Sequence, residues 1–330
     1  MTTLAPLLEA FFLKRLIRQR QASPNTIASY RDTFRLLLRF VEKKLGKKAS
    51  NLLLADLQAP MITAFLDFLE TERKNCPRSR NARLSAIRSF FHYAATEAPE
   101  HSALIQRVLA IPQKRFERKT VEFLTRQETD ALLAAPDTSS WIGRRDRALL
   151  LLAEQTGLRV SEITHLTWAD VRIEGHGPHV RCMGKGRKER VTPLRKETVA
   201  LLRAWLREQS AQPTEPLFPS SRGGFISRDA VEKRLHKHAS KAAVSCPSLA
   251  NKCVSPHVLR HTRAVRMLEA GIDSAVIALW LGHESVETTH VYLAADLAAK
   301  ERALAKTAPS PAAARRYRPP DRLLAFLNKL

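Results

Sequence analysis

The sequence predicts a mainly α-helical protein with one small antiparallel β-sheet, divided into two domains. Three observations support this prediction. Long apolar stripes advance in steps of three and four residues, a short region of alternating apolar residues surrounds a glycine turn, and the length of 330 residues exceeds that of one ordinary domain. Hydrophobic residues make up 44% of the chain, which is enough for a packed core in each domain.

Residues 1–110 show the periodicity of a helical bundle. The second of its helices is marked most clearly, because Ser23 is a capping residue followed by proline and because Gly46 comes directly after the apolar stripe. Arginine and lysine side chains flank the stripes. The four helices expected here begin near Leu4, Pro24, Pro60 and Pro77.

A basic segment at residues 111–122 is predicted to link the two domains. It is followed by Thr125 and Glu128, whose spacing is that of a capping box at the start of a helix. We therefore place the second domain at residues 123–300.

Within the second domain the pattern changes from helical to strand-like and back. Alternating apolar residues between positions 171 and 194 surround Gly184-Lys185-Gly186, which predicts strands joined by a glycine turn. The helices expected here cover residues 144–156, 196–208, 227–243, 256–270 and 274–281. A glycine follows three of these helices as an expected C-terminal cap: Gly157, Gly271 and Gly282.

The charge of the chain predicts a polyanionic partner. Lys and Arg total 55 against 32 Asp and Glu, which gives a formal net charge of +23. The surplus is spread along the chain, since residues 1–120 alone contain 22 basic and 10 acidic residues. This distribution is typical of a nucleic-acid-binding protein. From charge alone, a basic ribosome-associated or merely soluble protein is the alternative.

Other features narrow the class of protein. The chain has no run of about 20 apolar residues that could span a bilayer, and its start lacks the pattern of a signal peptide. The four cysteines show no disulfide-like or CxxC spacing. Cys246, Cys253 and His257 could suggest zinc, but their intervals match no common site. We therefore expect a cytoplasmic, nucleoid-associated protein without a membrane segment, a metal or another cofactor.

Four separated segments carry residues suited to the chemistry of a phosphate. His257 and Arg260 lie on one face in the first turn of a predicted helix, where free N–H groups favour an anion. Arg159 follows a helix stop and has Glu162 as an available ion-pair partner. Each group alone is more often a surface or core feature. The segments are Thr156–Glu162, Gly184–Arg190, His257–His261 and Leu281–Tyr292.

In this order and spacing the four segments resemble the tyrosine recombinase family, which includes phage-type integrases and Xer-like recombinases. The family pattern runs T-G-L-R-x-S-E, G-K-G-x-K-E-R, H-x-L-R-H and L-G-H-x(8)-Y, and the chain has every element. The resemblance covers residues 120–295 and, more loosely, the N-terminal bundle. It implies a SAM-like helical bundle followed by a tyrosine-recombinase catalytic domain with the DNA breaking-rejoining fold.

The resemblance also implies a role for each site residue. Arg159 and Arg260 would be the catalytic arginine pair, and Tyr292 would be the nucleophile. Lys185 would be the general acid of the hairpin, and His257 and His283 would be two further active-site groups. Glu162 would support the arginines from behind. Seven basic residues are expected to contact DNA: Arg80, Arg83, Arg88, Lys114, Arg115, Arg187 and Lys188.

The function expected from these residues is site-specific DNA recombination through a 3′-phosphotyrosyl intermediate and a Holliday junction. The expected partners are double-stranded DNA with an inverted-repeat site and three further copies of the chain, which together make a tetramer. A type IB-like topoisomerase and a catalytically silent DNA-binding relative are the alternatives. Residues 301–330 form a Pro-rich tail that is longer than an Xer-like protein would have. Its apolar end is expected to dock on a neighbouring subunit or, alternatively, to fold back in cis.

Overall fold

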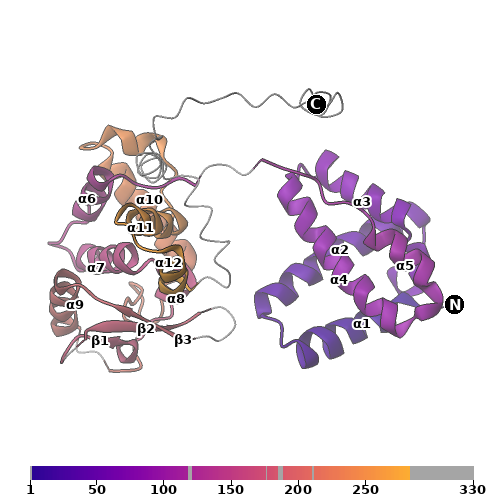
Figure 1. Ribbon diagram of the computed structural model, residues 1–330, viewed down its shortest axis with the longest axis horizontal. Coiled ribbons are helices and arrows are strands. Elements are labelled where there is room, and N and C mark those ends of the chain that lie inside the picture. Colours follow the sequence, from indigo (N-terminus) through magenta and orange to yellow (C-terminus); the bar gives the residue numbers. More distant parts are fainter. Residues whose placement is uncertain (1, 118–120, 176, 185–188, 210–211, 283–330) are drawn as a thin grey trace, which may run out of the picture. The chain divides into compact units, whose positions relative to one another are not determined.

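The computed structural model describes residues 2–117, 121–175, 177–184, 189–209 and 212–282. The chain divides into two compact units, Met1–Arg118 and Lys119–Leu330 (Figure 1). Helices dominate the described part of both units, and the described strands form one three-stranded antiparallel sheet. The predicted fold class, mainly helical with a small antiparallel sheet, is confirmed.

The described elements of the first unit are helices and short helical turns, apart from one isolated β-bridge between Thr3 and Leu53. Its long helices are α1 (Leu4–Ala10), its π-helical continuation η1 (Phe11–Gln19), α2 (Pro24–Leu45), α3 (Ala59–Thr71), α4 (Pro77–Glu97) and α5 (Ser102–Leu109). Short 3₁₀ turns lie between them: η2 (Ala49–Asn51), η3 (Leu54–Asp56) and η4 (Pro99–His101). The four helices expected from the sequence are present, and α5 is an addition that the sequence pattern did not predict separately.

The two ends of α2 are capped by the residues that the sequence predicted. The Ser23 hydroxyl accepts a hydrogen bond from the Thr26 amide at 3.2 Å, as a capping residue should. At the other end, Gly46 has a φ of 66°, which is a left-handed conformation that glycine adopts without steric cost. Aromatic rings then join the helices, since Phe11 of η1 packs against Phe34 of α2 and Phe90 of α4.

The second unit begins with helices, continues through the sheet and returns to helices. Its α-helices are α6 (Arg126–Ala134), α7 (Trp141–Thr156), α8 (Val160–Ile163), α9 (Lys196–Glu208), α10 (Arg228–Ala242), α11 (Pro256–Glu269) and α12 (Ser274–Leu281). Its strands are β1 (Val171–Arg172), β2 (His179–Met183) and β3 (Glu189–Pro193). Its described residues also form the 3₁₀ turns η5 (Trp168–Asp170) and η7 (Pro247–Asn251).

The caps of the second unit agree with the sequence except at α7. The capping box of Thr125 and Glu128 is formed in both directions at the start of α6. Helix α7 begins at Trp141, three residues earlier than predicted, because the Ser140 hydroxyl accepts a hydrogen bond from the Gly143 amide and caps the helix there. Ser140 is thus a capping signal that the apolar stripe did not reveal.

The sheet has the order β1-β2-β3, with both neighbouring pairs antiparallel. In the β2–β3 register Cys182 lies opposite Arg190 and Val180 lies opposite Thr192. Val180, Cys182 and Thr192 are buried, so this face of the hairpin points into the unit. The register therefore directs Arg190 inward as well.

A buried ionic network ties α7 to α10. The Asp146 carboxylate, which is 2% exposed, accepts hydrogen bonds from Arg145, from Arg234 at 2.6 Å and from His238 at 2.7 Å. Burial alone would raise the pKa of Asp146, but these bonds outweigh it and hold the pKa below the ordinary value. Asp146 therefore stays ionised and cross-links the two helices.

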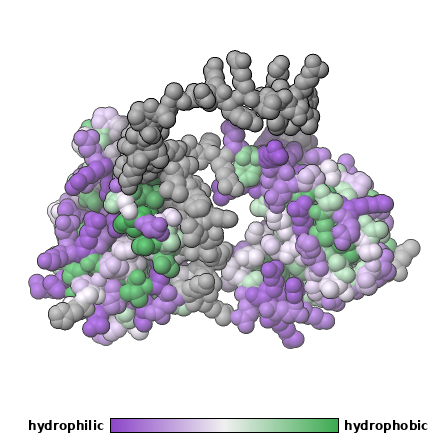
Figure 2. Space-filling view, viewed as in Figure 1, coloured by the Kyte–Doolittle hydropathy of each residue, from purple (hydrophilic) through white to green (hydrophobic). Residues whose placement is uncertain are grey.

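Figure 2 shows hydrophilic side chains over much of the visible described face, with smaller hydrophobic patches between them. Among the described residues, no helix is both long enough and apolar enough to cross a membrane.

Candidate active site

Four of the predicted site residues lie together in the second unit. Arg159 and Glu162 belong to the N-terminal end of α8, and His257 and Arg260 belong to the first turns of α11. The remaining predicted catalytic residues lie outside the described residues: Lys185, His283 and Tyr292. The described part of the site therefore consists of two arginines, one glutamate and one histidine.

Gly157 makes the approach between α7 and α12 possible. Its φ is 64°, so it ends α7 in the left-handed conformation that was predicted. A Cβ atom at this position would lie only 2.6 Å from Leu281 Cδ2, so a larger residue would force the buried Leu281 side chain of α12 to shift. The chain then turns directly into Arg159, the residue that caps α8.

Glu162 organises the start of α8. Its carboxylate accepts a hydrogen bond from the Arg159 backbone amide at 2.7 Å and from Arg159 Nη1 at 3.0 Å. The Glu162 side chain is 5% exposed, whereas the Arg159 side chain is 27% exposed. This arrangement leaves the carboxylate buried beside the arginine and the arginine partly open to solvent.

Arg260 is buried in the base of the site. Its Nη1 donates to the Gly157 carbonyl and its Nη2 donates to the Leu281 carbonyl, both at 2.6 Å. Only 4% of the residue is exposed. A buried guanidinium needs such acceptors, because an isolated charge would be costly to remove from water.

Arg190 ends the G-K-G-x-K-E-R motif, but the sequence predicted no role of its own for it. Its Nη2 lies 2.7 Å from Glu162 Oε2 and its Nη1 donates to the Leu281 carbonyl at 2.7 Å. The signal that could have revealed it is strand alternation, since Arg190 shares the inward face of β3 with the buried Thr192.

The C-terminal end of α12 is the point on which three arginines meet, and we call Arg159, Arg190 and Arg260 the arginine cluster. Arg190 and Arg260 both donate to the Leu281 carbonyl, and Arg159 Nη2 donates to the Gly282 carbonyl at 2.9 Å. Terminal carbonyls of a helix lack partners within the helix and carry partial negative charge. Three guanidinium groups with one carboxylate give this corner a surplus of positive charge.

Two histidines lie beside the arginine cluster on α11. His257 is at the surface, and its ring is stacked on that of His261 at a centroid distance of 6.2 Å. Partial loss of hydration lowers the pKa of His257, and the charges of Arg260, Arg228 and Arg159 lower it further, while Glu232 opposes them. Burial and the neighbouring His257 and Arg260 lower the pKa of His261 to about 4. Both rings are therefore neutral near pH 7.

Cys182 lies under the arginine cluster, opposite Arg190 in the sheet. Burial raises the pKa of its thiol to about 11, and the nearby arginines oppose this only in part. The thiol is therefore protonated and a poor nucleophile. In the described ranges no group of three or more His, Cys, Asp or Glu residues is arranged to hold a metal ion.

The basic residues predicted to contact DNA are placed in different ways in the first unit. Arg80 is 4% exposed, and its Nε lies 3.4 Å from Glu70 Oε2. We therefore assign Arg80 to the packing of this unit, because its buried guanidinium is already paired with the Glu70 carboxylate. Lys114 and Arg115 are exposed. Arg187 and Lys188 lie outside the described residues.

Arg83 and Arg88 are half-buried on α4. Burial lowers the pKa of Arg83, whose Nη1 approaches the Thr33 hydroxyl at 3.5 Å. Arg88 donates to the Ile111 carbonyl at the end of the bundle. Both arginines thus combine a structural contact with partial access to solvent.

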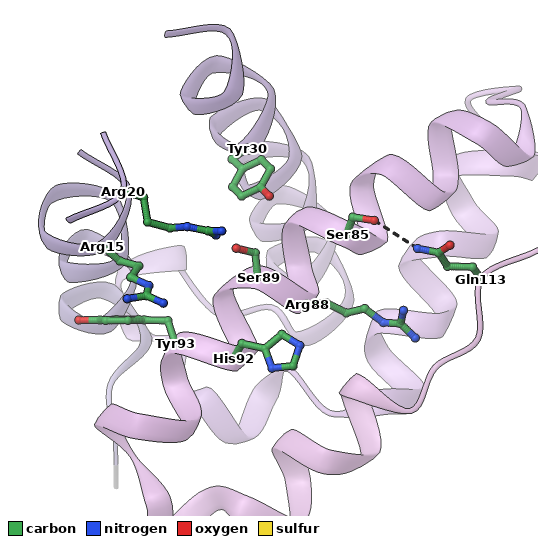
Figure 3. Close-up of a pocket in the computed structure, with 9 residues that line it drawn as sticks. All are labelled: Arg15, Arg20, Tyr30, Ser85, Arg88, Ser89, His92, Tyr93 and Gln113. Atoms are coloured by element: carbon green, nitrogen blue, oxygen red, sulfur yellow. Dashed lines mark hydrogen bonds between the residues drawn. The ribbon is translucent and has the colours of Figure 1, made fainter. Parts of the chain in front are cut away.

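Arg88 also lines a cleft of about 330 Å³ in the first unit, which we call the N-terminal basic pocket (Figure 3). None of the nine described residues that line it is acidic. In Figure 3, Arg20 extends toward Ser89, and the Gln113 side chain bonds to the Ser85 hydroxyl at 3.3 Å. The nine residues are Arg15, Arg20, Tyr30, Ser85, Arg88, Ser89, His92, Tyr93 and Gln113. This composition suits an anion.

Comparison with known proteins identifies the class. Residues 122–298 match the model of the phage integrase family, and residues 10–98 match the phage integrase N-terminal SAM-like domain. The chain belongs to the phage integrase family and is a site-specific tyrosine recombinase.

Two relatives agree with this class, and a solved structure has a similar fold. The chain is 60% identical over 328 residues to "Putative integrase/recombinase y4rC" of Sinorhizobium fredii, covering 99% of this chain and 98% of that protein. It is 34% identical over 290 residues to tyrosine recombinase XerC of Pelobacter propionicus, covering 87% and 91%. The fold resembles the Tn1549 transposon integrase in complex with transposon right end DNA, at 15% identity and a TM-score of 0.70, covering 93% of this chain and all of that one.

Proposed function

We propose that this recombinase cuts and rejoins DNA strands through a covalent bond between Tyr292 and the 3′ phosphate. The observation that carries the proposal is the convergence of Arg159 and Arg260 with Glu162 at the end of α12. The chain leaves this point through His283 and reaches Tyr292 nine residues later. Two arginines placed together in this way suit the non-bridging oxygens of one phosphate.

The arginines supply what a tyrosine lacks as a nucleophile. With an ordinary pKa near 10, a tyrosine is about one part in a thousand ionised at pH 7, a handicap of roughly 4 kcal/mol. Positive groups already oriented at the phosphate stabilise the charge that develops in the transition state. Arg159 and Arg260 fill this role with His283. Hydrogen bonds to backbone carbonyls keep the side chains of Arg159 and Arg260 oriented before DNA binds.

Proton transfer completes the first step. As the bond from the Tyr292 oxygen to phosphorus forms, His257 assists removal of the phenolic proton, and the neutral state of its ring suits it to accept one. The bond from phosphorus to the 5′ oxygen breaks, and Lys185 gives that oxygen a proton. The 5′ hydroxyl of a partner strand later attacks the phosphotyrosine and releases the enzyme. Because the covalent intermediate retains the bond energy, rejoining needs no nucleotide cofactor.

The biological reaction we propose joins two DNA sites, each an inverted repeat bound by two protomers. Strand exchange then passes through a Holliday junction within a tetramer. Such a reaction would serve integration, excision, resolution or transposition of a DNA element by a cytoplasmic, nucleoid-associated protein. The apolar end of the tail at residues 301–330 would dock on a neighbouring protomer. Truncation after Ala308 should then spare DNA binding and impair synapsis, and unchanged recombination would refute the docking.

DNA affinity would come from basic residues outside the active site. On the first unit these are Arg83, Arg88, Lys114 and Arg115, and Arg187 and Lys188 would act on the second unit. Contacts of lysine and arginine with phosphates make binding depend steeply on salt. They position the duplex without reading its sequence.

A nicked recombination site tests the proposed function directly. Cleavage next to the nick releases a short fragment, so religation fails and the covalent adduct accumulates. The wild-type protein should form this adduct only on its own site, and Tyr292→Phe should bind DNA normally but form none. A covalent DNA adduct of the Tyr292→Phe variant would contradict the assignment of Tyr292 as the nucleophile. Indiscriminate trapping would favour a topoisomerase, and none at all would favour a silent DNA-binding relative.

A second substrate tests Lys185. Lys185→Ala should cleave ordinary DNA slowly, because the departing 5′ alkoxide has no proton donor. It should recover when the leaving group is a 5′ thiolate, which departs without a proton. If the variant stays slow on the thiolate substrate, Lys185 is not the general acid.

A further inference from the structure

Arg190 connects three separate parts of the second unit. It is the second residue of β3, so its backbone belongs to the hairpin that carries Lys185 five residues earlier in the sequence. Its guanidinium reaches Glu162 on α8 and the last carbonyl of α12, on Leu281. A single side chain therefore joins the hairpin, the acid behind Arg159 and the end of α12.

The contacts of Arg190 indicate that it acts through other residues. Its side chain is 10% exposed, and each of its terminal nitrogens is already engaged, Nη1 by Leu281 and Nη2 by Glu162. To touch a phosphate, Arg190 would have to give up its ion pair with the buried Glu162 carboxylate, whereas Nη1 and Nη2 of Arg260 donate to neutral backbone carbonyls. Arg159 is nearly three times as exposed as Arg190 and is better placed for contact with a phosphate.

Glu162 is shared between two arginines. Arg159 Nη1 binds Oε1 at 3.0 Å, while Arg190 Nη2 binds Oε2 at 2.7 Å. The carboxylate is almost fully buried, and removal of Arg190 would take away a charged donor from Oε2 and leave it the backbone amide of Arg159. Glu162 would then be free to swing toward Arg159, and the guanidinium of Arg159 would move with it.

The close fit at Gly282 supports a specific role for this contact. A Cβ atom on Gly282 would lie 2.3 Å from Arg190 Nη1, and Gly282 has a φ of 64°. The left-handed cap thus removes the one atom that would block the guanidinium from the end of α12. The fit therefore involves β3, α8 and the end of α12 together, and not only the ion pair between Arg190 and Glu162.

We propose that Arg190 is a positioning residue for the recombination reaction. It fixes Glu162, and through Glu162 it holds Arg159 at the angle from which Arg159 binds the scissile phosphate. The inference rests on the proposed function, because it assumes that Arg159 acts on that phosphate. The β2–β3 hairpin would then have two roles: it carries Lys185, and through Arg190 it positions Arg159.

The test compares Arg190→Lys and Arg190→Gln with wild-type protein in single-turnover cleavage of the nicked site. Both variants should cleave 10- to 100-fold more slowly, which is about the range seen when a residue that orients an active-site group is removed. DNA affinity should stay within about 3-fold of wild type, because phosphate contacts elsewhere set it. Arg190→Lys keeps the charge and much of the volume, so it guards against a trivial loss of folding.

A matched control lies on the same hairpin. Arg181 of β2 has a side chain that is 50% exposed and a long 3.9 Å contact with Glu189. Arg181→Gln removes the same charge from the same element without touching Glu162. It should cleave at the wild-type rate.

A neutral substrate separates positioning from general loosening. Replacing the scissile phosphate by a methylphosphonate removes the charge of one non-bridging oxygen, and with it much of the need for Arg159. If Arg190 acts through Arg159, the deficit of Arg190→Lys relative to wild type should shrink about 10-fold on this substrate, as should that of Arg159→Lys.

Two results would overturn the proposal. One is wild-type cleavage by Arg190→Lys, and the other is a deficit that is the same on both substrates. Failure of the proposed function looks different, because the wild-type protein itself would then form no adduct on the ordinary phosphate.

Discussion

Arginine is used in two different ways at two sites of this recombinase, the arginine cluster of the second unit and the N-terminal basic pocket of the first. In the second unit the arginine cluster is held by backbone carbonyls and by one buried carboxylate, with donor–acceptor distances of 2.6 to 3.0 Å for its main contacts. At the N-terminal basic pocket, Arg15 and Arg20 are exposed, and Arg15 donates to the exposed side chain of Gln19. The third arginine, Arg88, is half-buried and donates to the Ile111 carbonyl.

This difference indicates which step the arginine cluster and the arginines of the N-terminal basic pocket are each suited to promote. Groups fixed before the substrate arrives lose little entropy and need no reorganisation, so they can favour a transition state. Exposed, adaptable groups contribute charge and displace counterions, so they mainly raise affinity. We therefore expect the second unit to control the rate of cleavage and the first unit to control the strength of binding.

The largest effect should come from Arg260. Arg260→Gln removes a preorganised donor at the reacting phosphate, which should lower the single-turnover cleavage rate by about 1,000-fold, equivalent to roughly 4 kcal/mol of activation free energy. DNA affinity should change by no more than about 3-fold. A loss of affinity with an intact rate at saturating DNA would break the comparison, since Arg260 would then be a binding residue.

The ionic network around Asp146 lies away from the active site, so breaking it should lower the stability of the second unit and leave the cleavage rate unchanged. Asp146→Asn leaves Arg145 and Arg234 without their charged partner and should destabilise the second unit by about 3–5 kcal/mol in urea unfolding. Cleavage by the folded fraction should be nearly unchanged. This result would sharpen the comparison, because it shows that a held guanidinium affects rate only where a phosphate reacts.

The pH dependence of this stability has a definite sign. The pKa of Asp146 is lowered in the folded protein, so its contribution is present above the ordinary value of about 3.9 and is lost as the pH falls through the folded value. The stability gap between wild type and Asp146→Asn should be constant from about pH 5 to 8 and should narrow below about pH 4. Asp130→Asn, at an exposed position of α6, is the control and should leave stability unchanged.

The N-terminal basic pocket should affect binding alone. Combined replacement of Arg15, Arg20 and Arg88 by Gln should weaken DNA binding about 10-fold at physiological salt. The slope of log K against log salt should fall by about 0.9 for each phosphate that the variant no longer neutralises. The cleavage rate at saturating DNA should stay within about 3-fold of wild type.

A charge-matched control distinguishes the pocket from net charge. Lys43, Lys44 and Lys48 are exposed at and beyond the C-terminal end of α2, outside the pocket. Their combined replacement by Gln removes the same charge and should weaken binding much less. Equal losses of affinity in the two triple variants would show that the pocket has no special role.

The smallest effect should appear in the pH profile of cleavage. The pKa of His257 is lowered by partial burial and by nearby arginines, so its neutral form persists below the ordinary value of 6.5. Arg228→Gln removes one of these positive charges and frees Glu232, its partner at 2.9 Å, which opposes them. The acid limb of the profile should therefore move to higher pH by a few tenths of a unit. A shift to lower pH would contradict the assigned role of Arg228.

The sequence predicted the helices of this protein well where capping residues marked their ends. Ser23 and Gly46 delimit α2 as expected, and Thr125 opens α6. The start of α7 was misplaced because the cap at Ser140 lies outside the apolar stripe. Local signals of this kind depend on neighbours in the chain, so one sequence suffices to read them.

The candidate site was only partly predictable. The motifs identified Arg159, Glu162 and Arg260, and the fold brings them together. Arg190 was missed because its role depends on the register of β2 and β3 and on the position of α12, which are long-range properties. Arg80 was assigned to DNA for the same reason, since its burial beside Glu70 cannot be seen in the pattern of α4.

One paired measurement tests the central claim most directly. The DNA dissociation constant and the single-turnover cleavage rate are determined on the same nicked site for Arg260→Gln and for the triple variant of Arg15, Arg20 and Arg88. We predict opposite patterns: Arg260→Gln loses about 1,000-fold in rate with nearly unchanged affinity, and the triple variant loses about 10-fold in affinity with a nearly unchanged rate. If both variants lose the same quantity, the division of labour between the two sets of arginines is contradicted.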